Sequence, residues 1–207
     1  MTFAREPRIH PVAVKDLRPT QITVGMREVT EKRLRWRAHA AGKKADFLGD
    51  HLIPVVLGPR RKPYVIDHHH LARALYEEKV PNVAITVVAD LSELKRDAFW
   101  VYLDNRSWSH LYDAHGVRRD HTHLPKDVSG LIDDPYRSLA GELRRAGGFA
   151  KDTAPFSEFL WADFLRPRIK PKVAADQPEA ALEDAIRLAK SPEAGYLPGW
   201  CGPFEAT

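Results

Sequence analysis

Apolar and polar residues alternate over several short stretches in the first half of the chain, which is the pattern of half-buried β-strands. We expect strands at residues 8–14, 53–57, 64–66 and 83–89. The two middle strands are separated by Gly, Pro and basic residues at 58–63, which predicts a hairpin. Residues 17–21 are expected to form the turn that leaves the first strand, because Pro19 cannot donate a hydrogen bond to a neighbouring strand.

Helical spacing of apolar residues replaces this alternation elsewhere. We expect helices at residues 30–41, 71–78, 134–145, 156–165 and 179–190, and another that Ser92 caps. In the first helix Leu34 and Ala38 share one face, and Gly42 is placed to end it. The Pro/Gly-rich tail at 196–204 is expected to be a surface wrap or a loose end.

This order of elements predicts an α/β (α+β) fold. We expect a small mixed-sheet domain over residues 1–106 and a helical extension over residues 107–207 that packs on it. The aromatic run is predicted to lie in the core of the extension, because its spacing is helical; it consists of Phe156, Phe159, Leu160 and Phe164.

Composition narrows the class of protein. The 207 residues are 43% hydrophobic, yet no apolar run is long enough to cross a bilayer, so we expect no membrane partner. One cysteine, Cys201, cannot form an internal disulfide or a cysteine-rich zinc site. We therefore expect a cytoplasmic protein.

The formal net charge is +4, which permits an anionic partner without requiring one. Basic residues gather at 33–37, 60–62 and 166–172. Each cluster can equally be an ordinary solvated face. We expect only weak, nonspecific binding to nucleic acid.

The residues most able to bind an anion or to transfer a proton lie where the strand at 64–66 passes into a helix. Asp67, His68, His69 and His70 occupy this junction, and Arg73 follows one helical turn later. The first N–H groups of a helix lack intrahelical partners, and the helix dipole favours an anion there. Asp67, His69 and His70 are the acid/base candidates. Ordinary capping and partly buried imidazoles are the structural alternative.

This junction resembles the phosphate-binding turn of the ParB/sulfiredoxin superfamily, whose usual form is Asp-Gly-His-His-Arg before a helix with Ala. The segment Gly25-Met-Arg27 is similar to the end of the first ParB box. Residues 133–141 and 159–168 resemble the branch named putative ParB-like nucleases. The resemblance implies a sulfiredoxin-like sheet, with Gln21, Gly25, Arg27, His68 and Arg73 around a phosphate or nucleotide.

Three departures from that pattern matter. His68 stands where the family has a glycine, and Leu71 where it has an arginine, for which Arg73 is the possible replacement. The cysteine that the sulfiredoxin branch needs in this turn is missing, which disfavours sulfiredoxin activity.

Nucleotide-using ParB proteins carry a second box, Glu-Asn followed by Arg. Asp104, Asn105 and Arg106 stand in a similar place, and the resemblance implies a Mg²⁺ ion with a nucleotide there. An ordinary helix exit is the alternative.

Some relatives with this fold phosphorylate small hydroxyl compounds with ATP or ADP, using a carboxylate near the first turn as base. Gln21 occupies that neighbourhood, and an amide cannot accept the proton. Glu28 and Glu31 are expected on the solvated start of the helix, which weakens the kinase hypothesis.

A second histidine group offers a metal-site hypothesis, although its spacing fits no known zinc signature; it consists of His110, His115, His121 and His123. The alternative is a polar loop over the active-site face.

Two functional hypotheses follow. The first is a phosphate-handling enzyme, either a nuclease (hydrolase) or a phosphotransferase, acting at the Asp67–His70 turn. The second is a module that binds a nucleotide or DNA without turnover, with the helices after residue 107 as a partner or homodimer surface. No compact helix-turn-helix pattern is evident, which disfavours chromosome partitioning.

Overall fold

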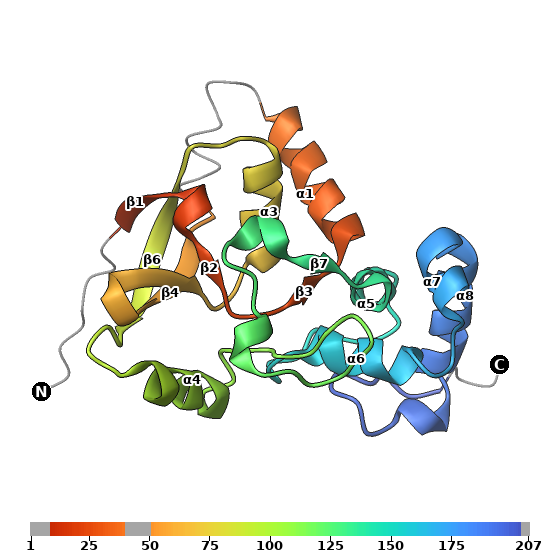
Figure 1. Cartoon of the computed structure of the whole chain (residues 1–207). Coiled ribbons are helices and arrows are strands. Elements are labelled where there is room, and N and C mark those ends of the chain that lie inside the picture. Colours follow the sequence, from red (N-terminus) through yellow and green to blue (C-terminus); the bar gives the residue numbers. More distant parts are fainter. Residues whose placement is uncertain (1–8, 40–50, 204–207) are drawn as a thin grey trace, which may run out of the picture.

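A computed structural model describes residues 9–39 and 51–203, and the predicted helix end at Gly42 lies outside these ranges. Its main feature is a curled mixed sheet with the strand order β1-β6-β4-β5-β2 (Figure 1). The strands are β1 (Ile9–Ala13), β2 (Arg18–Pro19), β4 (Ile53–Gly58), β5 (Lys62–Val65) and β6 (Asn82–Asp90). β4 pairs antiparallel with β5, which confirms the predicted hairpin, and parallel with β6.

A second, two-stranded sheet joins distant parts of the sequence. β3 (Thr23–Val24) runs parallel to β7 (Ile132–Asp133). An isolated bridge between Gln21 and His110 lies just before β3. The segment before α1 is therefore hydrogen-bonded to the second half of the chain, beyond the predicted boundary at residue 106. That boundary stays a prediction.

The helices cover the sheet and extend beyond it. They are α1 (Met26–Ala38), α3 (His69–Glu77), α4 (Arg96–Asn105), α5 (Pro135–Arg145), α6 (Ser157–Leu165), α7 (Pro171–Asp176) and α8 (Pro178–Ala189). Figure 1 shows α7 and α8 at the end of the molecule away from β1. The mixed α/β fold with helices at its C-terminal end, as predicted, is confirmed.

Buried apolar side chains form three clusters. The first lies between the sheet and the helices α1 and α3, with Val55 and Leu75 fully buried in it. The second holds the C-terminal helices together around Leu139 and Trp161. The third packs α4 on the other side of the sheet through Phe99. The junction after β5 lies between the first and third clusters, because Ile66 packs against the third and Leu71 belongs to the first.

Several local predictions were wrong. Pro19 belongs to strand β2, which is tolerated because β2 is the last strand of the sheet and lies at its edge. Helix α1 begins at Met26 rather than at residue 30, and it buries Val29 and Trp36 while Leu34 is 58% exposed. The packing of α1 against α3 and α5, and not the local apolar spacing, decides which face of the helix is buried.

Two further corrections concern helix ends. Ser92 does not cap α4, because both its N–H and its hydroxyl donate to the Asp90 carboxylate, and Lys95 precedes the helix instead. Leu160 on α6 is exposed, whereas Phe159 and Phe164 are buried as predicted. Within residues 9–39 and 51–203, no helix combines the length and apolar character needed to span a bilayer.

Candidate functional site

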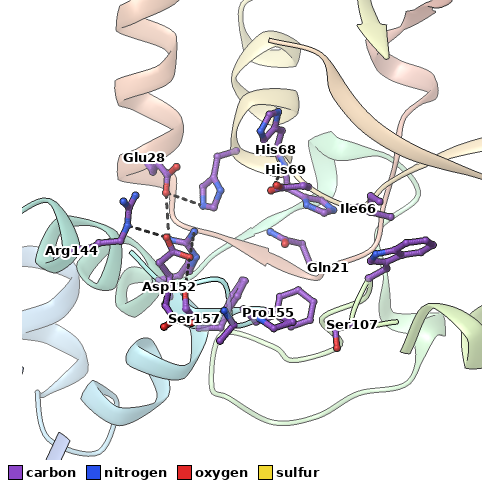
Figure 2. A pocket seen from close by; sticks show the side chains of 18 of the residues that line it. Gln21, Glu28, Ile66, His68, His69, Ser107, Arg144, Asp152, Pro155 and Ser157 are labelled. Carbon is purple, nitrogen blue, oxygen red and sulfur yellow. Dashed lines mark hydrogen bonds and ion pairs between the residues drawn. The ribbon is translucent and has the colours of Figure 1, made fainter. Parts of the chain in front are cut away.

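The start of α3 opens into a pocket of about 780 Å³. Its walls come from α1, from the β5–α3 junction, from α5, and from the segment 151–159 that leads into α6. Figure 2 shows Ile66 and Ser107 at one end and Glu28, Arg144 and Asp152 at the other. The pocket thus has a largely apolar end and a charged end, with the start of α3 between them.

The backbone at the start of α3 is shaped by His68. This residue has φ 65°, in the left-handed region that favours glycine and in which His is more frequent than most residues. Its ring Nδ1 lies 3.0 Å from the Leu52 carbonyl oxygen, and its N–H donates to Asp67 Oδ1 at 2.6 Å. A histidine therefore adopts here a backbone conformation that favours glycine, at the position where the resemblance led us to expect one.

The first intrahelical hydrogen bond of α3 runs from the Ala72 N–H to the His68 carbonyl. The N–H groups of His69, His70 and Leu71 come before it and have no carbonyl one turn earlier. They lie at the positive end of the helix dipole, at a junction that lines the pocket. This is the geometry of an anion seat.

His69 is buried beneath this seat. Its Nε2 accepts a hydrogen bond from the Thr20 N–H at 3.2 Å, while the Thr20 hydroxyl donates to the Val65 carbonyl at 2.7 Å. Burial lowers the pKa of His69 to about 3. The ring is therefore neutral at pH 7, and it fixes the start of α3 to the strand β2 region.

His70 is hydrogen-bonded to the 20–25 segment in the same way as His69. Its Nε2 accepts from the Gly25 N–H at 3.0 Å and lies 3.6 Å from Glu28 Oε2. Burial lowers the pKa of His70 well below its ordinary value. A side chain at Gly25 would stand 2.6 Å from Ser138 Oγ, so this glycine lets α5 approach α1. Because Nε2 of each neutral ring accepts a backbone hydrogen bond, the ring proton lies on Nδ1 and neither imidazole is free to act as a base.

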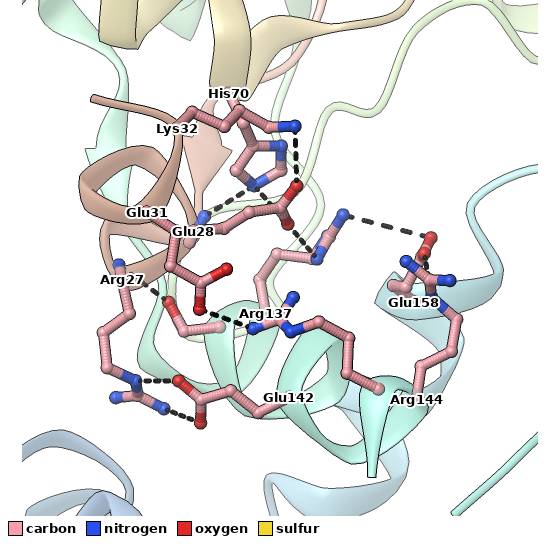
Figure 3. A network of polar contacts seen from close by, with 12 residues as sticks. Arg27, Glu28, Glu31, Lys32, His70, Arg137, Glu142, Arg144 and Glu158 are labelled. Carbon is pink, nitrogen blue, oxygen red and sulfur yellow. Dashed lines mark hydrogen bonds and ion pairs between the residues drawn. The ribbon is translucent and has the colours of Figure 1, made fainter. Parts of the chain in front are cut away.

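The charged end of the pocket is a network of alternating signs (Figure 3). Glu28 Oε2 lies 3.3 Å from a terminal nitrogen of Arg137, and Glu28 Oε1 lies 3.5 Å from Lys32 Nζ. Arg137 also reaches Glu158 at 3.9 Å, and Arg144 Nε lies 3.1 Å from the same carboxylate. Arg137 is largely buried, and its Nε has no hydrogen-bond partner among the described residues.

Glu28 corrects one expectation. Its side chain is 20% exposed and lines the pocket instead of lying on a solvated helix start. Glu31 faces elsewhere and pairs with Arg145 at 2.8 Å. Arg137, Arg144 and Glu158 were not predicted as site residues, because they reach this pocket only through the packing of α5 against α1 and of α6 against α5.

Comparison with known proteins places this geometry in a family. A family model described as "Putative ParB-like nuclease" matches residues 10–167. The chain belongs to this ParB-like family. The predicted resemblance is thereby confirmed, and the match extends across the predicted domain boundary.

A solved structure supports the same assignment. The crystal structure of protein Atu1540 from Agrobacterium tumefaciens is 52% identical, with a TM-score of 0.90, over 95% of this chain and 98% of that one. A comparison with curated proteins found no match.

Some predicted site residues of this ParB-like chain line the pocket. Asp67, His68, His69 and His70 do so, as does Gln21, whose side-chain amide donates to the Thr23 carbonyl at 2.7 Å. Gly25 lies directly behind the pocket through its bond to His70. The structure therefore brings together most of the residues around the Asp67–His70 turn.

The other predicted phosphate ligands lie outside the pocket lining. Arg27 pairs with Glu142 at 2.7 Å, and Arg73 donates to Glu77 at 2.9 Å and to the Leu131 carbonyl at 2.7 Å. Both guanidinium groups link helices to neighbouring segments.

The second predicted box also lies apart from the pocket lining. Asp104 pairs with Arg118 at 2.8 Å, Arg106 stacks over the Trp108 ring at 4.9 Å, and Asn105 ends helix α4. A phosphate-binding role for this box and for Arg27 and Arg73 stays a prediction.

The second histidine group does not converge on one point. His110 is buried and stacks on Phe159 with 3.7 Å between ring centroids, whereas His121 stacks on Trp100. Within the part of the chain that the structure describes, no group of three or more His, Cys, Asp or Glu side chains is arranged to hold a metal ion.

Proposed function

We propose that this ParB-like chain is a phosphate-handling enzyme that binds a nucleotide or phosphodiester at the start of α3. The observation that carries the proposal is the anion seat formed by the N–H groups of His69, His70 and Leu71, of which His69 and His70 line a pocket of about 780 Å³. Ligand pockets are commonly about 300 to 1,000 Å³, so a nucleotide fits this volume. The ligand phosphate would accept hydrogen bonds from the free N–H groups of α3.

Asp67 is the proposed general base for hydrolysis. Its Oδ1 is held by the His68 N–H, and the side chain is exposed beside the seat. In a hydrolytic step a water oxygen would bond to phosphorus, Asp67 would take the water proton, and the P–O ester bond would break, with solvent protonating the leaving oxygen. Lys32, Arg137 and Arg144 would stabilise the negative charge that develops.

His69 and His70 have a positioning role in this proposal. Each imidazole accepts from a backbone N–H in the 20–25 segment, so together they hold the start of α3 at a fixed distance from α1. Because both rings are neutral, they add no charge that would compete for the phosphate.

A Mg²⁺ ion would bind at this site only together with the nucleotide, whose phosphates would supply some of its ligands. Magnesium is commonly held by one or two carboxylates together with substrate phosphates. Asp67 and Glu28 are the pocket carboxylates that flank the seat, and they are the residues that would contact such an ion. The ion would supply charge neutralisation for the phosphate oxygens.

A second candidate function is transfer of a phosphoryl group from ATP or ADP to a small hydroxyl compound. The position of Glu28 favours it, because this carboxylate replaces the missing base at Gln21 on the pocket wall. Non-catalytic binding of a nucleotide or DNA is the third reading of the same seat.

A thermal-shift panel with two variants tests these alternatives. With ATP, ADP, CTP and a 12-nucleotide single strand, each with and without Mg²⁺, we expect one ligand to stabilise the protein by about 2.7 kcal/mol at 100 times its Kd. Asp67→Asn should keep that shift in the absence of Mg²⁺ and lose at least 100-fold in hydrolysis. Glu28→Gln should instead abolish transfer to hydroxyl compounds if the kinase is the true activity.

The same panel can contradict the proposal. No stabilisation by any phosphate-bearing ligand would exclude the seat as a binding site. Stabilisation without turnover in the wild type, unchanged in Asp67→Asn, would leave the non-catalytic binding module as the function.

A further inference from the structure

A second hollow lies apart from the α3 pocket, on the face of the sheet that α4 covers. It has a volume of about 340 Å³ and is lined by the basic side chains of Arg60, Lys62 and Arg96 and by the rings of Tyr64, Phe99 and Trp100. None of the described residues that line it is acidic. The α3 pocket, by contrast, includes Glu28, Asp67, Asp152 and Glu158 among its lining residues.

The three cations of the hollow are available to a ligand. Within residues 9–39 and 51–203, no ion pair is formed by Arg60, Lys62 or Arg96. Their neighbour Arg61 differs, because it pairs with Asp90 at 3.1 Å. Arg60 and Arg61 both have positive φ, at 62° and 54°, and this turn sends one guanidinium to the hollow and the other to Asp90.

Three aromatic rings, those of Tyr64, Phe99 and Trp100, form the other wall of the hollow. Tyr64 packs against Phe99 with ring centroids 4.7 Å apart, and edge-on against Trp100 at 5.5 Å. A side chain at Gly58 would stand 2.5 Å from the Tyr64 ring and 2.7 Å from Phe99, so this glycine makes room for the pair. Tyr64 remains half-buried, and its ring borders the hollow.

The guanidinium groups are close enough to influence the tyrosine. Burial raises the pKa of the Tyr64 hydroxyl, while Arg18, Arg96 and Arg60 act in the opposite direction. The hydroxyl is therefore protonated at pH 7, and it can donate a hydrogen bond next to the cations.

We propose that this hollow docks a single-stranded nucleic acid, with phosphates on Arg60, Lys62 and Arg96 and a base against Tyr64. Proteins that bind single strands combine a positive groove with aromatic rings on which bases stack. This hollow combines three cations with the half-buried ring of Tyr64. The α3 pocket differs in charge, because its lining combines four carboxylates with four cations, whereas the lining of the hollow carries cations alone. The assignment is independent of the catalytic proposal for α3.

The third apolar cluster connects the two sites. Tyr64 and Ile66 are two residues apart along β5 and its extension, and both pack against this cluster, as do Trp100 and Trp108. Tyr64 and Trp100 line the hollow, whereas Ile66 and Trp108 line the apolar end of the α3 pocket. A strand held in the hollow would therefore lie beside the phosphate seat.

Fluorescence anisotropy with a fluorescein-labelled 12-nucleotide single-stranded DNA of mixed sequence tests the assignment on the full chain. We expect measurable binding at 50 mM salt that weakens as salt rises. The triple variant Arg60→Ala, Lys62→Ala, Arg96→Ala should bind at least tenfold more weakly. Its log–log salt slope should be smaller by about 2, since each phosphate contact on a single strand contributes about 0.7.

A matched control removes the same charge elsewhere. Lys15, Lys170 and Lys172 are exposed and lie outside the lining of the hollow, and replacing all three with Ala should change the affinity less than threefold. Tyr64→Leu should weaken binding at least fivefold without changing the salt slope, because it removes a stacking face but no charge. Melting temperatures of all variants verify that each is folded.

Two results would overturn the inference: no binding by the wild type at 50 mM salt, or equal losses in the two triple variants. Failure of the proposed function is distinguishable from both. If nucleotides fail to stabilise the protein while the Arg60 triple variant still loses the oligonucleotide, the α3 proposal fails and the docking site stands.

Discussion

Lowering the pH from 7 to 5 is expected to reduce the free energy of unfolding by about 4 kcal/mol, at about 2 kcal/mol for each of His69 and His110, and the burial of His70 adds to this loss. Burial lowers the pKa of His69 and His110 to about 3 and that of His70 well below its ordinary value. In the unfolded chain these side chains bind a proton near pH 6.5. Their contribution to stability is therefore complete above that pH and is lost progressively as pH falls toward 3.

Urea unfolding followed by tryptophan fluorescence at pH 7, 6 and 5 measures this effect. His110→Phe should recover about 2 kcal/mol of the loss, because its ring packs against Phe159 and its Nδ1 has no partner among the described residues. His123→Gln is the matched control, because it replaces an exposed imidazole instead of a buried one. An unfolding free energy that does not vary between pH 7 and 5 would show that the histidines are protonated in the folded state.

Asp134→Ala is expected to destabilise the protein by about 3 to 5 kcal/mol, the usual cost of leaving one partner of a buried ion pair alone. Asp134 is 1% exposed, and its Oδ2 lies 2.9 Å from Arg166. It also caps α5, accepting from the Tyr136 N–H at 3.0 Å. Since α5 carries Arg137 and Arg144, ligand binding at the pocket should fall together with stability.

Asp163→Ala is the control for that variant. Asp163 contacts the same Arg166 at 3.2 Å, but its side chain is 45% exposed. An exposed ion pair contributes about 0 to 1 kcal/mol, so this change should be nearly neutral in urea unfolding. Equal effects of the two substitutions would mean that neither burial nor capping distinguishes Asp134.

Much of the sheet could be predicted from the sequence, because strand alternation and the Gly/Pro turn at 58–63 are local signals. The edge strand β2 could not, since only its position at the end of the sheet makes Pro19 acceptable. The same holds for α1, where the apolar residue Leu34 is exposed and Trp36 is buried by tertiary packing.

The site could also be predicted only in part, because some of its residues are brought there by tertiary packing. The Asp67–His70 turn is contiguous, so its residue types and its strand-to-helix position reveal it. Arg137, Arg144 and Glu158 lie about seventy to ninety residues further along the chain, and no local pattern around them indicates that they reach the same pocket. The depth of His69 and His70 also depends on the 20–25 segment that covers them, which a turn motif does not specify.

Amide NMR of the start of α3 tests the central claim most directly. On titration with the nucleotide that gives the largest thermal shift, the ¹H–¹⁵N signals of His69, His70 and Leu71 should move most, because their N–H groups would donate to the phosphate. The amide of Ala72, already bonded to the His68 carbonyl, should move less. Binding that leaves the three signals in place and shifts others instead would contradict a phosphate seat at α3.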